Sequence, residues 1–232
     1  MKKINEVTDT EKEILSYNSY HLDNPEKLEG WEMVYHETET RSGFEGQVYK
    51  KGNTVVIVYK GTDAGSFKDY VNDAQMLFNN IPKQQEDAYN LFLKTQLMFK
   101  DSDVNIELTG HSLGGSLAQV VSAKSGVSAT TFNAFGTGKI LKKMGYKDKQ
   151  LYNMSVKNYG NPKDPIFNFN SLEQPGKTFI TNTNLDPKRI YPITHGLSSS
   201  NLKYHSMENM NNLDDAVEIT PLKDGKKYNI YT

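Results

Sequence analysis

The chain has 232 residues, with 27 Lys and Arg against 28 Asp and Glu, so its net charge is close to zero. This balance excludes a strongly basic nucleic-acid binder, and no polybasic tract predicts attraction to anionic lipid. Cysteine is absent, which excludes disulfides, thiolate metal sites and a cysteine nucleophile. The length favours one large core, and there is no repeat, linker or composition break. We therefore expect a single domain over residues 1–232.

The N-terminal residues predict no targeting segment. Residues 1–9 begin with basic side chains but lack the apolar stretch that a signal peptide needs. No run approaches the roughly 18 apolar residues of a membrane span. We expect a soluble protein that either stays in the cytoplasm or leaves the cell by a bacterial route that needs no cleaved signal.

The first quarter of the chain predicts a short helix followed by strands. Residues 10–22, with Ile14, Leu15 and Tyr17 apolar, stop before an Asp-Asn-Pro turn, which predicts a helix. Residues 31–36 alternate apolar and polar side chains, as a strand does. Residues 44–49 and 54–59 flank a turn that contains Gly-Asn, which predicts a hairpin. The second arm is continuously apolar, and we expect it to lie in the centre of the sheet.

Two helices are predicted after this hairpin. Residues 60–65 form a glycine-bearing loop that ends the strand, and residues 67–78 favour a helix. Pro82 is predicted to open a longer helix that runs to about residue 100. Apolar side chains recur in the longer helix at three-to-four spacing, which gives it a face that can pack on the sheet.

A possible nucleophile lies between a predicted strand, residues 104–108, and a predicted helix, residues 113–124. The junction Gly110-His111-Ser112-Leu113-Gly114 is a G-x-S-x-G pattern, which is typical of a nucleophile elbow in this context. The turn is sharp enough to strain the backbone at the serine, and it requires small residues at Gly110 and Gly114. We predict that Ser112 is the nucleophile; the alternative is a serine that only caps the helix.

The second half of the chain continues the alternation of strands and helices. Residues 129–134 and 154–158 predict strands, with a short basic helix at residues 139–144 between them. Residues 216–220 and 228–231 flank Asp-Gly and predict a second hairpin. The order of elements predicts an α/β fold of the α/β-hydrolase kind. Its central sheet would be mostly parallel and flanked by helices, with antiparallel additions at the N-terminal side.

A serine hydroxyl needs an imidazole that is oriented by a carboxylate before it can act as a nucleophile. In α/β-hydrolase topology the chain order is Ser, acid, His. Two histidines follow Ser112, His195 and His205, and both remain candidate bases.

Asp164 is the preferred acid because it follows a predicted strand and lies in a Pro-flanked loop. The carboxyl edge of the sheet would display it there. Asp186 is the competitor, but no clear strand leads into it. The alternative for Asp164 is an aspartate that only forms a turn.

Two backbone N–H groups are predicted to stabilise the oxyanion. One belongs to Leu113, directly after the nucleophile, and the other to Thr62, in the loop that follows a central strand. Gly61 lets the backbone turn there, and the Thr62 hydroxyl could add a third donor. The alternative is an ordinary strand-to-loop turn.

Several stretches match one family pattern in combination. Thr109–Gly115 reads Thr-Gly-His-Ser-Leu-Gly-Gly, and Tyr59–Thr62 matches an oxyanion loop in which Lys60 replaces the usual Arg. Tyr70–Asp73 occupies the position of the family's Trp-x-x-Asp, and Asp164–Ile166 that of its Asp-Pro-Val. Phe135-Gly136 matches the family's Phe-Gly strand end but lacks the Pro-Arg that usually follows. From about residue 43 to residue 209 the chain resembles the class 3 (fungal-type) lipases, with the closest likeness to their bacterial and phage-borne members.

The resemblance implies a serine hydrolase of glycerolipid or phospholipid esters. Tyr204–Met210 resembles the His-Ser-Leu/Met-x-Asn ending of bacterial relatives and leaves a long segment after Asp164, which favours His205 over His195. Residues 136–139 lack the residues that a phosphate loop needs, and residues 209–215 lack the ligand spacing of a calcium loop. We therefore expect no cofactor and no metal.

An apolar cluster, residues 76–81, follows the oxyanion loop and includes Met76, Leu77, Phe78 and Ile81. In lipases this region forms a lid or the rim of the acyl pocket, so transient contact with a membrane surface is expected. The alternative is a helix buried against its own core.

Two other functions fit the same sequence. One is a phospholipase A1 toxin domain that a signal-less secretion system delivers to rival cells, with an immunity or secretion partner. The other is a catalytically inactive module that keeps the lipase fold and only binds.

Overall fold

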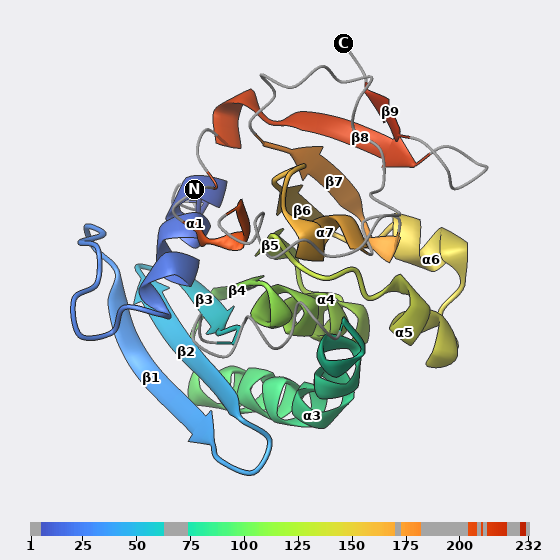
Figure 1. The fold of residues 1–232 in the computed structure, drawn as a ribbon. Coiled ribbons are helices and arrows are strands. Elements are labelled where there is room, and N and C mark those ends of the chain that lie inside the picture. The colour runs from blue at the N-terminus through green and yellow to red at the C-terminus, as the bar shows by residue number, and fades with distance from the viewer. Residues whose placement is uncertain are drawn as a thin grey trace.

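The computed structural model describes residues 6–62, 74–169, 173–181, 204–207, 210, 213–221 and 228–230. Within these ranges nine strands form one sheet, in which every strand lies beside its neighbours in sequence (Figure 1). The strands are β1 (Glu32–Glu39), β2 (Phe44–Lys51), β3 (Thr54–Tyr59), β4 (Asn105–His111), β5 (Ala129–Phe132), β6 (Val156–Gly160), β7 (Lys177–Ile180), β8 (Val217–Pro221) and β9 (Tyr228–Ile230). The α-helices are α1 (Asp9–Asn18), α3 (Ala74–Met98), α4 (Leu113–Ser125), α5 (Gly138–Lys143), α6 (Asp148–Tyr152) and α7 (Pro165–Phe169).

Strands β3 to β7 run parallel, and antiparallel strands extend this sheet at both ends. The predicted α/β fold with a mostly parallel core is therefore confirmed. The antiparallel strands β1 and β2 lie at the N-terminal side as expected. A second antiparallel pair, β8 and β9, continues the sheet at the other end, where the sequence had indicated only a hairpin.

The boundary predicted at Pro82 is wrong. Helix α3 begins at Ala74 and continues through Pro82 to Met98. Proline has no N–H to donate within a helix, which is why the sequence favoured a helix start there. The described part of α3 buries Ile81 and Leu91 completely, and this packing outweighs the lost hydrogen bond. None of the helices in the ranges described could span a membrane, by length and apolar character.

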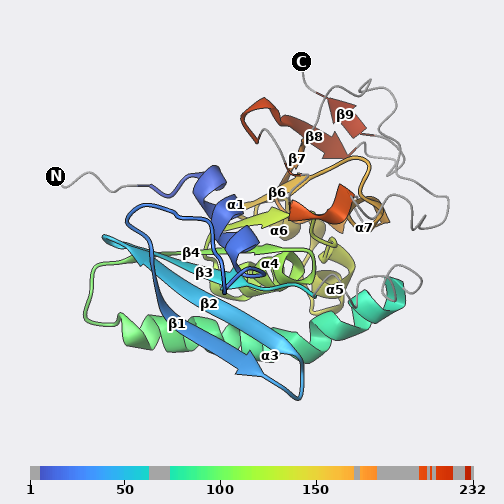
Figure 2. The ribbon, with the colours of Figure 1, turned by 60° about the vertical axis from the view of Figure 1, so that its left-hand side comes forward.

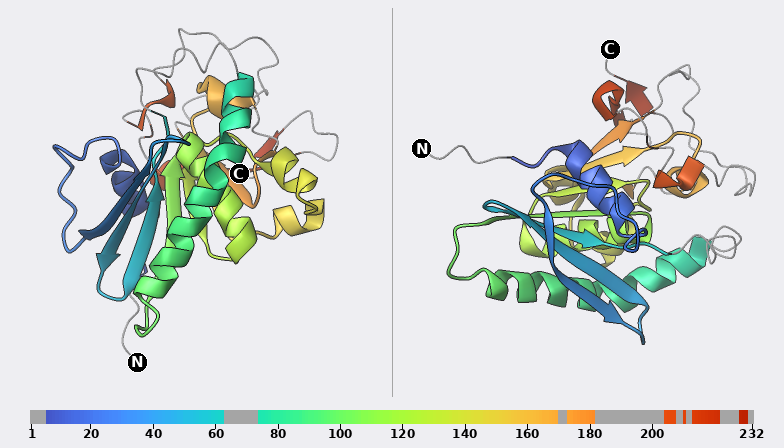
Figure 3. Two further views of the ribbon diagram at one scale, coloured as in Figure 1. Left: turned by 90° about the horizontal axis from the view of Figure 1, so that it is seen from below. Right: turned by 90° about the vertical axis from the view of Figure 1, so that its left-hand side faces the viewer.

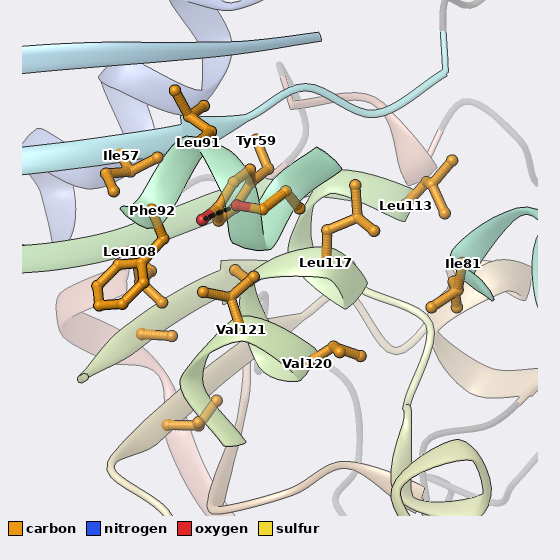
Figure 4. Packing of buried hydrophobic residues seen from close by; sticks show 14 of the residues in the cluster. Ile57, Tyr59, Ile81, Leu91, Phe92, Leu108, Leu113, Leu117, Val120 and Val121 are labelled. Atoms are coloured by element: carbon orange, nitrogen blue, oxygen red, sulfur yellow. Dashed lines mark hydrogen bonds between the residues drawn. The ribbon is translucent and has the colours of Figure 1, made fainter. Parts of the chain in front are cut away.

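Helices cover both faces of the sheet. Helices α3 and α4 lie against one face and α1 lies against the other (Figure 2 and Figure 3). The alternation of strand β3 explains this, because Ile57 and Tyr59 pack with the α3 and α4 side chains, whereas Val56 and Val58 pack with Leu15 of α1. Figure 4 shows the first cluster, in which the Tyr59 hydroxyl donates to the Ala88 carbonyl of α3 at 3.1 Å.

Buried charges attach α1 to the sheet. The Lys12 ammonium forms an ion pair with Glu107 of β4 and lies 3.6 Å from Asp9. Asp9 in turn accepts hydrogen bonds from Lys157 at 2.7 Å and from the Tyr159 hydroxyl at 2.8 Å, both on β6. Because each charge in the cluster has an opposite partner, the cluster holds the helix at one position over strands β4 and β6.

Candidate active site

Ser112 is the single residue between the end of strand β4 and the start of helix α4, and its backbone conformation is strained. Its φ is 56° and its ψ is −126°, a combination that residues other than glycine rarely adopt. The Ser112 N–H donates to the Phe132 carbonyl of β5 at 3.0 Å, which ties the turn to the next strand. The Ser112 Oγ is buried and forms no hydrogen bond within the described residues. A buried hydroxyl without a partner is typical of a reactive position rather than a structural one.

Two glycines allow the turn at Ser112. A Cβ atom on Gly114 would overlap the Tyr59 carbonyl, and one on Gly110 would lie 2.7 Å from the same oxygen. Strand β3, strand β4 and the start of α4 therefore approach one another more closely than side chains would permit. This is the small-residue requirement that the elbow pattern predicts.

Asp164 and His205 lie together, as the chain order required. The His205 Nδ1 lies 2.8 Å from Asp164 Oδ2, and the two residues are 4% and 0% exposed. Since a carboxylate only accepts, Nδ1 carries the hydrogen, and Nε2 is the nitrogen that can accept a proton. Asp164 Oδ1 accepts the Ile166 N–H at 2.9 Å, so both carboxylate oxygens are bonded. His195 and Asp186, the competing base and acid, lie outside the described residues.

Asn133 connects the acid to the base. It follows strand β5 directly in the left-handed region, with φ 45°. Its Oδ1 accepts the Asn161 N–H at 2.8 Å, in the loop that leads to Asp164. Its Nδ2 donates to the carbonyls of Tyr204 and His205, at 3.2 and 3.3 Å. Sequence reasoning missed this residue, although a polar side chain directly after a parallel strand is a usable signal.

An aromatic stack lies under the segment of residues 204–207, the base segment. Phe132, Tyr159 and Phe179 occupy paired positions on β5, β6 and β7, with ring centroids 5.9 and 5.0 Å apart. Met207 and Met210 pack against Phe132 and Tyr159. The apolar side chains around His205 therefore bury one end of the base segment and hold it over the strand ends.

His111, directly before the nucleophile, takes part in the same arrangement. Its ring centroid lies 4.7 Å from that of His205, and its Nε2 lies 2.6 Å from the His205 carbonyl oxygen. Burial, together with the neighbouring His205, holds the pKa of His111 well below its usual value, although the bond to the His205 carbonyl opposes this. His111 is therefore neutral, with its single hydrogen on Nε2, because a carbonyl can only accept.

The oxyanion loop, residues 59–62, lies against the elbow. A Cβ atom on Gly61 would be 3.1 Å from the Ser112 Cβ and 2.7 Å from the His111 carbonyl. The Gly61 N–H donates to the Tyr20 hydroxyl at 3.1 Å, so this amide already has an acceptor within the protein. Leu113 contributes the first amide of α4, which has no acceptor inside the helix.

The residues predicted for a lid fall at the start of α3. Met76, Leu77 and Phe78 belong to the helix, but their side chains lie outside the described part. Ile81 is fully buried in the core cluster. At this residue the structure agrees with the alternative reading, a helix buried against its own core. Across the residues described, no group of three or more His, Asp or Glu side chains could hold a metal ion.

The strand order, the elbow and the helices on both faces define an α/β-hydrolase of the lipase type. The chain is similar to Rhizomucor miehei lipase in its propeptide complex, with a TM-score of 0.53 and 15% identity over 76% of this chain and 68% of that one. It is similar to lipase II from Rhizopus niveus, with a TM-score of 0.54 and 14% identity over 75% of this chain and 80% of that one. At these identities the likeness shows the fold alone.

The model of a phospholipase-like family, described as the Tle-like phospholipase domain, matches residues 8–179, and the chain belongs to this family. It is similar to the extracellular phospholipase A1 of Serratia liquefaciens, with 30% identity over 95 residues. That match spans 41% of this chain and only 28% of the Serratia protein. Family and fold together are those of hydrolases that act on lipid esters.

Proposed function

We propose that this protein hydrolyses carboxylic esters of lipids, in the manner of a lipase or phospholipase A1, with Ser112 as nucleophile, His205 as base and Asp164 as acid. A single domain over residues 1–232 would carry this activity. The observation that supports it most is the buried bond between His205 Nδ1 and Asp164 Oδ2, 2.8 Å long, at the same strand ends as the strained Ser112.

In the first half of the reaction, Ser112 Oγ attacks the ester carbonyl and gives its proton to His205 Nε2. The carbonyl electron pair moves to the oxygen, where the amides of Thr62 and Leu113 stabilise the negative charge. Asp164 holds the imidazole in its productive tautomer and stabilises the imidazolium that forms.

The intermediate then collapses. The bond to the leaving alcohol breaks, His205 returns the proton to that oxygen, and the acyl group remains on Ser112. Water then attacks the acyl carbon and gives a proton to His205. The bond from the acyl carbon to Ser112 Oγ breaks, His205 returns the proton to Oγ, and the fatty acid leaves. Each step uses only the side chains and amides named above, with no cofactor.

The substrate we propose is a glycerolipid or phospholipid. Membership of a phospholipase-like family supports this choice. The apolar residues Met76, Leu77 and Phe78 follow the oxyanion loop closely in sequence and would contact the lipid surface. Replacing these three by Ser should lower hydrolysis of vesicle phospholipid more than hydrolysis of a short soluble ester.

The decisive experiment combines a fluorophosphonate probe with ester hydrolysis across acyl-chain lengths and phospholipid headgroups. Wild type should be labelled at Ser112 and active, Ser112→Ala should be neither, and Ser125→Ala, at the other end of α4, should match wild type. His205→Ala should abolish activity and His195→Ala should not. Full activity in His205→Ala would refute the triad. Failure of the probe to label folded wild type would favour an inactive binding module.

A narrower proposal is a phospholipase toxin with an immunity or secretion partner; the family match supports the phospholipase part of this proposal. Expression in another bacterium should then arrest growth, and Ser112→Ala should relieve the arrest. Normal growth of cells that make active enzyme would count against the toxin role while leaving the hydrolase intact.

A further inference from the structure

A chain of hydrogen bonds joins the oxyanion loop to the base segment. The Gly61 N–H donates to the Tyr20 hydroxyl at 3.1 Å, and the Tyr20 hydroxyl lies 2.9 Å from His111 Nδ1. On the other side of the ring, His111 Nε2 lies 2.6 Å from the carbonyl of His205. One hydroxyl and one imidazole thus connect the two parts of the site that must face the same substrate atom.

The direction of each bond follows from the chemistry of the groups. The His205 carbonyl can only accept, so His111 Nε2 donates, and neutral His111 then has a lone pair on Nδ1. Tyr20 donates its hydrogen to that lone pair and accepts from the Gly61 N–H. Every donor in this series of hydrogen bonds meets an acceptor. The other neutral tautomer of His111 would lose the bond from Nε2 to the His205 carbonyl.

Helix α1 holds the tyrosine in place. The Tyr20 N–H donates to the Tyr17 carbonyl at 3.1 Å, directly after the last turn of α1. The helix itself is attached to the sheet by the buried pair of Lys12 and Glu107 and by the bond between Ser16 and Thr109, 3.0 Å long. The Tyr20 hydroxyl is therefore presented by an element packed on the opposite face from α3 and α4 (Figure 2).

We propose that Tyr20 and His111 are positioning residues, which hold the oxyanion loop and the base segment at a fixed separation around Ser112. The proposal rests on the function proposed above and adds two residues that act through the Gly61 amide and the His205 carbonyl. Their effect is on the placement of the Thr62 amide and the His205 ring, so they should influence kcat rather than substrate binding.

Tyr20→Phe is the most direct test, because it keeps the ring and removes the hydroxyl that serves both Gly61 and His111. We expect kcat for a short soluble ester to fall about 10- to 100-fold while KM changes less than about twofold. Tyr17→Phe is the matched control, since it makes the same change three residues earlier, and no hydrogen bond of the Tyr17 hydroxyl is found among the described residues. It should leave kcat unchanged.

His111→Gln and His111→Asn test the two hydrogen bonds of His111 separately, the one to the His205 carbonyl and the one from the Tyr20 hydroxyl. The Gln amide reaches the place of Nε2 and can still donate to the His205 carbonyl, whereas the Asn oxygen lies near the place of Nδ1 and can accept from Tyr20. In His111→Gln the bond from Tyr20 is already broken, so adding Tyr20→Phe should cost less than the product of the two single losses. Fully multiplicative losses in this double-mutant cycle would overturn the proposal.

Nuclear magnetic resonance provides a readout that does not need activity. In Tyr20→Phe the Gly61 amide and the His205 ring resonances should both move, and in Tyr17→Phe both should stay. Unchanged Gly61 and His205 resonances in folded Tyr20→Phe would overturn the positioning role, even if the enzyme were active. If wild type neither hydrolyses esters nor reacts with the probe, the proposed function fails, and these resonances still decide whether the two segments are connected.

Discussion

The proposed nucleophile, Ser112, and the proposed base, His205, are held by different kinds of structure. Ser112 lies in a turn whose geometry follows from its near neighbours, with glycines two positions on either side and a helix that starts at the next residue. His205 lies in a short segment held by residues far along the chain. Asp164 is 41 positions away, Asn133 is 72 away and His111 is 94 away.

This difference predicts how each region responds to substitution. The elbow is backbone that is packed too closely for side chains, so changes there should act mainly on the stability of the fold. The base segment is held by apolar packing at one end and by single hydrogen bonds from side chains to carbonyls, and the loss of one of those bonds should act mainly on the rate. Five predictions test this division, from the largest expected effect to the smallest.

Asp164→Asn should have the largest effect, because it removes the carboxylate that orients His205. We expect kcat to fall about 10⁴-fold with little loss of stability, since the Asn oxygen can still accept the Ile166 N–H. Initial rates on a short ester and a thermal melt measure both quantities. Asp148→Asn, at an exposed position of α6, is the control. A loss of less than tenfold would show that another carboxylate serves the base.

Gly114→Ala should destabilise the fold most, because its Cβ would overlap the Tyr59 carbonyl. We expect the free energy of unfolding to fall by about 3 kcal/mol, as measured by urea denaturation. Gly126→Ala separates crowding from backbone strain, since its Cβ meets nothing within 4 Å and its φ is 76°; it should cost about 1 kcal/mol. Equal losses in the two variants would contradict the close-packing explanation.

Asn133→Asp tests the connection between acid and base. The substitution keeps the shape of the side chain but replaces the Nδ2 donor that faces the carbonyls of Tyr204 and His205 with an oxygen. We expect kcat to fall about tenfold because both hydrogen bonds of Nδ2 are lost, with a smaller relative change in KM. An unchanged kcat would mean that the His111 bond alone holds the base segment.

The lowered pKa of His111 should be visible in how the free energy of unfolding depends on pH. Its pKa in the fold is held well below the usual value near 6.5, so between the two values the unfolded chain binds the extra proton and the folded chain does not. Stability should therefore decrease as pH falls below about 6.5, by at most about 1.4 kcal/mol per pH unit from this residue. His111→Gln should show a shallower decrease in urea denaturation at pH 5 to 7. Equal slopes would contradict a buried neutral His111.

Ser112→Gly should produce the smallest change in the free energy of unfolding, and in the opposite direction. Glycine adopts the backbone angles at this position without strain, so the free energy of unfolding should rise by about 1 kcal/mol while activity disappears. Ser112→Ala loses the same hydroxyl but keeps the strain, and it should be no more stable than wild type. Equal stability of the Gly and Ala variants would show that the turn stores no strain.

Several parts of the fold could be predicted because their signals are local. The hairpin of β2 and β3 was predicted from its two-residue Gly-Asn turn, and the register Lys51 with Thr54 confirms it. The continuous apolar run of β3 indicated burial on both faces, and all six residues are buried. The start of α3 could not be predicted, because packing of α3 against the sheet overrides the preference of Pro82 for a first turn.

The sequence by itself determined the elbow and the fold class, since both depend on patterns within a few residues: a glycine-flanked serine between a strand and a helix, and alternation of apolar strands with amphipathic helices. Only the tertiary structure showed that Tyr20, His111 and Asn133 surround the base, because hydrogen bonds between distant residues leave no periodic trace in the chain. The elbow can therefore be recognised in a short stretch of sequence, whereas its supporting residues are visible only once the helix α1 and the strand ends are brought together.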